Sequence, residues 1–230
     1  MILAVVGGKG GVGKSTASYN LGAELDAVVV DADLAMADLP GGRGPDLHDV
    51  LADRASPVEA VRTGGPVALL PCGRSLAGAR ACDPARLVDA VEAVRDEYGP
   101  VVVDCPAGLR GDVGLGLFVA DACVLVTTPT PVALGDAMRA RALARELDAG
   151  LVAVALNRAT PDAPTGTIAA ELGGPVTTIP EDPAVERAQA AGRPVQSVTP
   201  ESPAAEAFAS LAASVRRALP VEGPAGRNGR

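Results

Sequence analysis

A glycine-rich loop near the start of this 230-residue chain constrains its fold more than any other feature. Residues 8–16 have the sequence GKGGVGKST, which fits the pattern G-x-x-x-x-G-K-[ST]. The loop follows an apolar run, 2–6, and precedes a helical pattern, 15–25, so it has the strand–loop–helix context that the motif requires. It also contains both lysines of the chain, Lys9 and Lys14, while every other basic residue is an arginine. We therefore predict a loop that binds the phosphates of a nucleotide.

The residue types in the loop suit phosphate chemistry. Glycines can adopt backbone angles that point successive N–H groups inward, and the first turn of the following helix adds unpaired N–H groups and a positive dipole end. We expect Lys14 to reach the β- and γ-phosphates, Ser15 to bind Mg²⁺ through its hydroxyl, and Thr16 to support the α-phosphate. The predicted phosphate-binding residues are Gly8, Gly10, Gly11, Val12, Gly13, Lys14, Ser15 and Thr16.

Lys9 separates this loop from an ordinary phosphate-binding loop, whose pattern specifies no lysine after the first glycine. Residues 9–16 resemble the deviant Walker A box of the MinD/ParA family of ATPases, in its MinD-like archaeal form, and the resemblance extends from residue 2 to about residue 218. It implies that two subunits sandwich two ATP molecules and that Lys9 of each subunit reaches the nucleotide held by the other. Lys9 would then stabilise charge as an arginine finger does. A solvated loop charge is the alternative.

Three aspartates follow the second apolar run, 27–30. Asp31 and Asp33 are two residues apart, so on an extended segment they share a face and would point toward Mg²⁺ and the γ-phosphate. The resemblance places the family's first switch here and implies that Asp33 orients the attacking water. Asp38 stands where the family usually has asparagine, which removes an N–H donor and adds a negative charge. A helix-capping and turn cluster is the alternative.

Another aspartate, Asp104, ends the apolar run 101–103 and matches the Walker B position, which holds Mg²⁺ through water or the loop hydroxyl. The sequence that follows resembles the family's second switch, in which Pro106 lies and Gly108 would sense the γ-phosphate; a strand-terminating turn is the alternative. The predictions are Lys9, Lys14 and Asp33 as catalytic residues, Ser15, Asp33 and Asp104 around Mg²⁺, and Asp31, Asp38, Pro106 and Gly108 as switch residues.

Nucleotide choice depends on residues later in the chain. Asn157 and Arg158 resemble the family's adenine-side pair, and Pro180 and Asp182 lie in a segment that resembles its second base-contacting loop. An asparagine after a strand is also an ordinary turn residue. Because the chain has no N-K-x-D guanine signature, we predict ATP rather than GTP, together with Mg²⁺.

Apolar runs alternate with helical patterns along the chain, and most runs are continuous, as in a sheet buried on both faces. This order predicts an α/β fold: a doubly wound, mostly parallel sheet with helices on both faces, of the P-loop NTPase (SIMIBI) class. We expect one domain, 1–219, and a disordered Pro/Gly-rich tail, 220–230. The expected strands are 2–6, 27–30, 67–70, 101–103, 122–127, 151–156 and 176–179, and the expected helices are 15–25, 83–97, 112–119, 131–148, 165–172, 183–191 and 201–219.

Composition limits the partners. The net charge of −8 argues against nucleic-acid binding through a broad basic face, although six arginines toward the carboxyl end could form a modest patch for DNA. No segment approaches the length of a membrane span, so we expect a cytoplasmic protein. The four cysteines have no metal-ligand spacing, which indicates buried, reduced thiols.

The tail lacks the bulky apolar residues of a membrane-targeting helix, and the stripe Phe208, Leu211, Val215 and Leu219 should pack on the core. This argues against direct membrane binding and favours a protein activator or receptor.

The predicted function is an ATP-dependent, homodimerising switch with slow, partner-stimulated hydrolysis. It would position a cellular structure, such as a division site, a chromosome or plasmid, or a polar assembly, and a partner could recruit it to a membrane or pole. Two alternatives stay open. One is a metal-cluster or cofactor-maturation ATPase, and the other is a nucleotide-binding regulator that hydrolyses ATP weakly.

Overall fold

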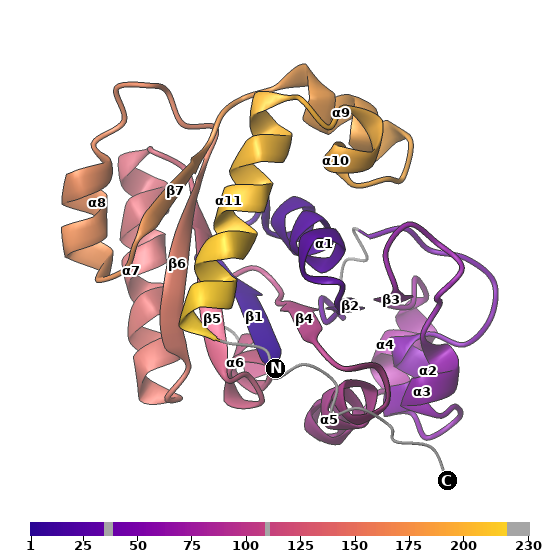
Figure 1. Ribbon diagram of the computed structural model, residues 1–230. Coiled ribbons are helices and arrows are strands. Elements are labelled where there is room, and N and C mark those ends of the chain that lie inside the picture. Colours follow the sequence, from indigo (N-terminus) through magenta and orange to yellow (C-terminus); the bar gives the residue numbers. More distant parts are fainter. Residues whose placement is uncertain (35–38, 109–110, 220–230) are drawn as a thin grey trace, which may run out of the picture.

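The computed structural model describes residues 1–34, 39–108 and 111–219, with the side chains of residues 111 and 112 left out. The predicted switch residue Asp38 and the predicted tail, 220–230, lie outside these residues. The strands of the described residues form one seven-stranded sheet in the order β3-β2-β4-β1-β5-β6-β7, and all the strand pairs are parallel (Figure 1). The strands are β1 (Ile2–Val6), β2 (Val28–Asp31), β3 (Leu69–Leu70), β4 (Val101–Asp104), β5 (Ala122–Thr127), β6 (Gly150–Asn157) and β7 (Val176–Ile179).

The sheet separates two hydrophobic cores because its central strands are buried on both faces. Along β1, Ile2, Ala4 and Val6 face one core, and Leu3 and Val5 face the other. Helices α5 to α8 cover the first face, together with the small helices α2 and α3, while α1 and α9 to α11 cover the second (Figure 1). This arrangement confirms the predicted doubly wound α/β fold.

The longer helices agree closely with the expected ranges. Thr165–Leu172 is helical as predicted, and other ends differ by one to two residues. The expected helix 83–97 is instead a 3₁₀ turn followed by an α-helix, because Asp83 caps the turn that Pro84 starts. These helices are α1 (Lys14–Leu25), η1 (Pro84–Arg86), α5 (Leu87–Tyr98), α6 (Gly111–Phe118), α7 (Pro131–Glu146), α8 (Thr165–Leu172), α9 (Pro183–Ala190) and α11 (Pro203–Ala218).

Four short helices and one strand differ from the sequence expectations. The strand expected at 67–70 contains only Leu69 and Leu70, because it lies at the sheet edge and residues 64–67, which begin with Gly64, Gly65 and Pro66, form a bend. The short helices have too few turns for a clear period of 3.6 residues. They are α2 (Leu47–Leu51), α3 (Pro57–Ala60), α4 (Leu76–Ala81) and α10 (Val195–Val198).

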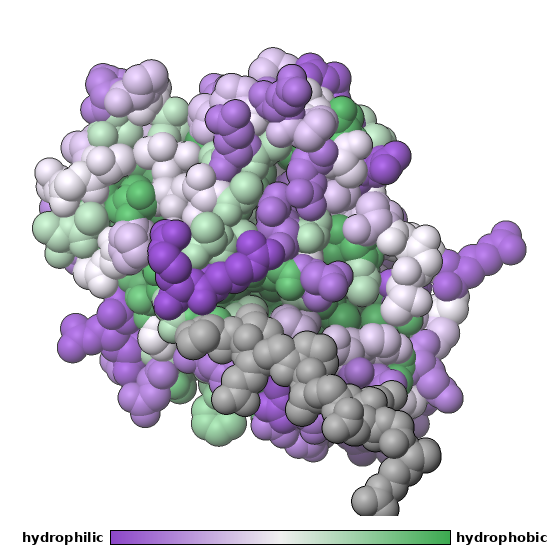
Figure 2. Space-filling view, in the orientation of Figure 1, coloured by the Kyte–Doolittle hydropathy of each residue, from purple (hydrophilic) through white to green (hydrophobic). Residues whose placement is uncertain are grey.

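The stripe on α11 packs as expected. Phe208, Leu211 and Val215 are buried in the core beside α1, and Leu219 packs against them. None of the four cysteines, which all lie in the described part of the chain, forms a disulfide, and three of them are buried. Figure 2 shows hydrophilic side chains spread over the visible face, with smaller hydrophobic areas between them. Among the described residues, no helix combines the length and the apolar character needed to cross a membrane.

Parallel pairing brings the predicted site to one edge of the sheet. In the β2–β4 pair Asp31 lies opposite Asp104, and in the β1–β4 pair Val5 lies opposite Asp104. The glycine-rich loop leaves β1 at this same edge. The structure therefore places the loop and both strand-end aspartates at the carboxyl ends of neighbouring strands, where ligands bind in such sheets.

Candidate functional site

The glycine-rich loop turns sharply into α1. Gly13, the residue before the helix, has φ of 100°, and Gly11 has φ of 77°, both in the left-handed region that favours glycine. A Cβ on Gly13 would also lie 2.2 Å from Asn157 Nδ2. Asn157 donates through that atom to the main-chain oxygen of Val12 over 2.8 Å. The end of β6 thus fixes the shape of the loop.

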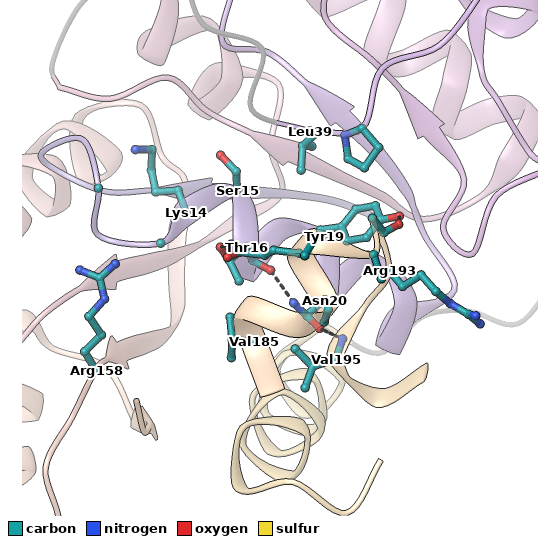
Figure 3. Close-up of a pocket in the computed structure, with 18 of the residues that line it drawn as sticks. Lys14, Ser15, Thr16, Tyr19, Asn20, Leu39, Arg158, Val185, Arg193 and Val195 are labelled. Carbon is teal, nitrogen blue, oxygen red and sulfur yellow. Dashed lines mark hydrogen bonds between the residues drawn. The ribbon is translucent and has the colours of Figure 1, made fainter. Parts of the chain in front are cut away.

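The two lysines of the loop occupy different environments. Lys14 is 8% exposed in the first turn of α1, and its Nζ donates to the main-chain oxygen of Lys9 over 3.4 Å. The Lys9 residue itself is exposed. Ser15 and Thr16 follow Lys14 at the helix start and line the adjoining cavity (Figure 3). The loop therefore presents an inward ammonium, two hydroxyls and free helix N–H groups to one space.

Asp104 is buried behind this helix start. Its Oδ1 accepts from Ser18 Oγ over 2.8 Å. Burial raises the pKa of Asp104 to about 6, although hydrogen bonds from Ser15 and Ser18 and the charge of Lys14 oppose the rise. The side chain predicted at the Walker B position is thus beside the loop hydroxyl with which it was expected to act.

Asp31 is fully buried at the end of β2. Burial raises its pKa to about 8, and the charge of Asp104 across the strand pair adds to the rise. Its Oδ1 accepts from the Asp33 N–H over 3.3 Å, while Oδ2 has no hydrogen bond among the described residues. A buried carboxylate oxygen without a partner at this edge is a place where a cation or its water would be favourable.

Asp33 lies beyond the end of the strand. The expectation that Asp31 and Asp33 share one face of an extended segment is wrong, because β2 ends at Asp31 and the Leu34 N–H bonds back to the Ala32 oxygen over 3.0 Å. Asp33 is half-buried at the resulting bend. It still lies close enough for its charge to raise the pKa values of both Asp31 and Asp104.

The second predicted switch runs alongside the loop. Pro106 is buried two residues after the end of β4, and Gly108 has φ of 92°. A Cβ on Gly10 would lie 3.9 Å from the Cβ of Ala107, so this segment and the glycine-rich loop are in van der Waals reach. Gly8 lies on another side, where α7 leaves no room for a side chain, since a Cβ there would meet the Asp136 main chain at 2.2 Å.

The four predicted adenine-side residues line a single cavity of about 140 Å³. Asn157 and Arg158 enter it from the end of β6, and Pro180 and Asp182 from the segment after β7. Both carboxylate oxygens of Asp182 already accept main-chain hydrogen bonds, from the Ala184 N–H over 2.8 Å and from the Ala204 N–H over 3.1 Å. The first of these bonds lowers its pKa most. Contact of these residues with a base stays a prediction.

A larger cavity of about 660 Å³ starts at the same helix end and continues along α1. It passes Tyr19 and Asn20 and reaches Leu39 and Arg193 (Figure 3). Arg158 and Arg193 lie on opposite sides of it in this view. The two cavities share Gly13 and Thr16, so the phosphate-binding loop opens into both.

Several supports of the site have no sequence signal. Gln189 on α9 donates to Thr16 Oγ1 over 2.7 Å. Asn20 donates to the Thr16 oxygen and accepts from the Val195 N–H, both over 2.8 Å, as the dashed lines in Figure 3 show. Tyr19 donates to the Gly192 oxygen over 2.9 Å. A single Gln, Asn or Tyr on a helix belongs to no motif, so only the tertiary structure identifies these contacts.

Comparison with known proteins agrees with this geometry. Residues 3–195 match the CobQ/CobB/MinD/ParA nucleotide binding domain. The chain is 34% identical over 228 residues to an ATP-binding protein of Methanocaldococcus jannaschii. This match covers 93% of this chain and 86% of that protein. The cell division ATPase MinD of Pyrococcus furiosus has a TM-score of 0.87 and 30% identity over 94% of this chain and 98% of its own. The septum site-determining protein MinD of Pyrococcus horikoshii, complexed with Mg-ADP, has a TM-score of 0.88 and 29% identity over 97% and 98%.

The described residues fit ATP and Mg²⁺. The loop supplies N–H donors and a buried ammonium for phosphate, and the Ser15 hydroxyl and the carboxylates of Asp104 and Asp31 supply the oxygen atoms that Mg²⁺ prefers. A similar fold carries Mg-ADP in the Pyrococcus horikoshii protein. ATP and Mg²⁺ are therefore the cofactors of this chain, which belongs to the MinD/ParA family of nucleotide-binding P-loop ATPases.

Proposed function

We propose that this protein is a switch that dimerises on binding ATP and separates after a slow, partner-stimulated hydrolysis. The observation that carries the proposal is the contrast between the two lysines of the loop. Lys14 is 8% exposed and its ammonium lies inside the loop, whereas Lys9 is exposed and is bound to Lys14 through its main-chain oxygen. A cation held at the rim of a phosphate site can act on a nucleotide across an interface.

The other residues divide the work at the phosphates. Lys14, Ser15, Thr16 and the glycines would hold the phosphate oxygens of ATP. Ser15, Asp33 and Asp104 would hold Mg²⁺, partly through water, and the ion would neutralise charge that develops on the β- and γ-phosphates. Asp33 would orient the attacking water. Asp31, Pro106 and Gly108 would link the state of the γ-phosphate to the two switch segments.

The output of such a switch is location. The two Pyrococcus relatives are named as a cell division ATPase and a septum site-determining protein, which supports a role in positioning a cellular structure. The apolar stripe of α11 is buried against α1, so this helix offers its polar side to solvent rather than a membrane-binding face. A protein receptor or activator that recruits a cytoplasmic dimer is therefore the mechanism that we favour.

The test is size-exclusion chromatography with light scattering on the wild type and two variants. Each protein is run with ATP and Mg²⁺, and separately with ADP, in low and high salt because the chain carries a net charge of −8. Asp33→Ala should form a stable dimer with ATP, because hydrolysis no longer ends the dimeric state. Lys9→Ala should stay monomeric with ATP although it still binds nucleotide.

A separate binding measurement makes the result decisive. A fluorescent ATP analogue should bind the wild type, Asp33→Ala and Lys9→Ala with similar affinity. If all three bind it and all three stay monomeric, the switch mechanism is wrong and the alternative of a weakly hydrolysing regulator gains support. Phosphate release by the wild type above the level of Asp33→Ala is the matching test of hydrolysis.

A further inference from the structure

The one histidine of the chain contacts the main chain beside the predicted catalytic aspartate. His48 lies on α2 and is 3% exposed. Its Nε2 lies 3.1 Å from the main-chain oxygen of Leu34, the residue after Asp33. A side chain from a different element thus holds the backbone one residue away from the carboxylate that we expect to orient water.

The bond requires a defined state of the ring. A carbonyl oxygen only accepts hydrogen bonds, so His48 Nε2 must carry the proton that it donates to Leu34. The Cys72 Sγ lies 3.4 Å from the same nitrogen and can share this proton as a weak acceptor. Nδ1 is buried and has no hydrogen-bond partner among the described residues. Among the described residues, the hydrogen bonds of the ring are therefore made by Nε2 alone.

The surroundings of His48 leave the ring little freedom. Helix α2 is fixed at its start, because the Leu47 N–H donates to the Pro71 oxygen at the end of β3 over 2.9 Å. Two glycines pack closely against the His48 ring. A Cβ on Gly73 would lie 2.3 Å from Nδ1, and a Cβ on Gly78 would lie 2.7 Å from it. Such close packing holds the donor in one place.

The far end of the first switch has a comparable contact. Arg74, which follows Gly73, donates from Nη2 to the main-chain oxygen of Leu39 over 3.4 Å. Residues 35–38 are outside the described residues, but the carbonyl on each side of them accepts a hydrogen bond from a side chain, from His48 on α2 or from Arg74 between β3 and α4. The His48 bond is the shorter of the two, and its donor residue is buried whereas Arg74 is exposed.

We propose that His48 is a positioning residue for ATP hydrolysis: its Nε2–H bond to Leu34 fixes the main chain that carries Asp33. The inference rests on the proposed function, in which Asp33 orients the attacking water. His48 belongs to α2 rather than to the phosphate-binding loop. Loss of the bond should therefore slow hydrolysis without weakening nucleotide binding, because a misplaced water-orienting group affects the reaction and not the ground state.

The experiment compares two amides that differ in reach. In His48→Gln the amide nitrogen can reach the position of Nε2 and donate to Leu34, whereas in His48→Asn the amide ends near Nδ1 and cannot reach it. Both variants are polar, so the comparison isolates the hydrogen bond. Single-turnover hydrolysis is measured with the protein in excess of ATP and at a concentration above its Kd, with Mg²⁺ saturating, and affinity is measured with a fluorescent ADP analogue.

The expected result is a rate about tenfold lower for His48→Asn and within about threefold of the wild type for His48→Gln, with both affinities within about twofold. Cys82→Ala is the control, since Cys82 Sγ contacts the main-chain oxygen of His48 at 3.8 Å and not its ring; this variant should react like the wild type. Circular dichroism at the assay temperature confirms that each variant is folded.

Three outcomes would overturn the proposal. Equal rates for His48→Asn and the wild type would show that the bond does not matter for hydrolysis, and equal losses in Asn and Gln variants would show that the donor is not the cause. A parallel loss of ADP affinity would assign His48 to general folding. The Asp33→Ala variant distinguishes a failure of the His48 proposal from a failure of the proposed function. If the wild type hydrolyses ATP no faster than this variant, the proposed hydrolysis itself is wrong.

Discussion

The buried pair Asp31 and Asp104 makes the nucleotide-free protein less stable as the pH rises. Asp31 has an ordinary pKa near 3.8 when unfolded and a pKa of about 8 in the folded chain, so the folded state holds a proton that the unfolded state has lost between these values. The unfolded state therefore binds fewer protons, and the free energy of unfolding falls with pH across this window. The slope is about 1.4 kcal/mol per pH unit for one such group.

Replacement of Asp31 by Asn removes this titration. The Asn Oδ1 can still accept from the Asp33 N–H, which bonds to the same oxygen of Asp31 over 3.3 Å. Compared with the wild type, the stability of Asp31→Asn should rise progressively from pH 5 to pH 8. Over these three pH units the ceiling is about 4 kcal/mol, and relaxation around the pair should reduce it to about half.

Urea unfolding followed by far-ultraviolet circular dichroism measures this difference, because the chain has no tryptophan. The measurements are made in EDTA at pH 5, 6, 7 and 8. Asp96→Asn is the control, since the Asp96 side chain is 69% exposed and pairs with Arg95 at the surface; it should change stability by less than about 0.5 kcal/mol at every pH. A stability gain for Asp31→Asn that does not grow with pH would refute the electrostatic argument.

Three further predictions concern the loop and the core. Asn157→Ala removes the 2.8 Å bond to Val12 and should raise the Kd for ATP about three- to tenfold, measured by calorimetry, whereas unchanged affinity would show that the loop keeps its shape alone. Gly13→Ala forces a side chain into φ of 100° and onto Asn157, so nucleotide binding should be lost and the thermal midpoint should fall. Leu211→Ala should lower the free energy of unfolding by about 3 kcal/mol, with exposed Ser210→Ala as its control; a loss below about 1 kcal/mol would mean that α11 is loosely packed.

Much of the fold follows from local sequence patterns. Six of the seven strands were predictable at close to their observed bounds, because most of their apolar runs are continuous, and Pro131 and Pro183 mark helix starts correctly. The short helix α2 was not predictable, since it is too short for a period to appear, and the strand expected at 67–70 is shortened to β3 for the same lack of a local signal. The bend after Asp31 was also missed, because the sequence does not show that the Ala32 oxygen accepts a hydrogen bond from Leu34.

The residues of the site also fall into a predictable and an unpredictable group, and the reason is chemical. Phosphate and Mg²⁺ restrict the residue types that can bind them, so Lys14, Ser15 and Asp104 are visible as motifs. The supports face a weaker restriction. Asn157 and His48 each donate to a main-chain oxygen of the site, and many side chains with an N–H could do so from a suitable place. A support is therefore selected by position in the fold rather than by residue pattern. It follows that substitutions of supports should be judged by reach and donor geometry, and that their first effect should fall on the shape and timing of the site rather than on which ligand it binds.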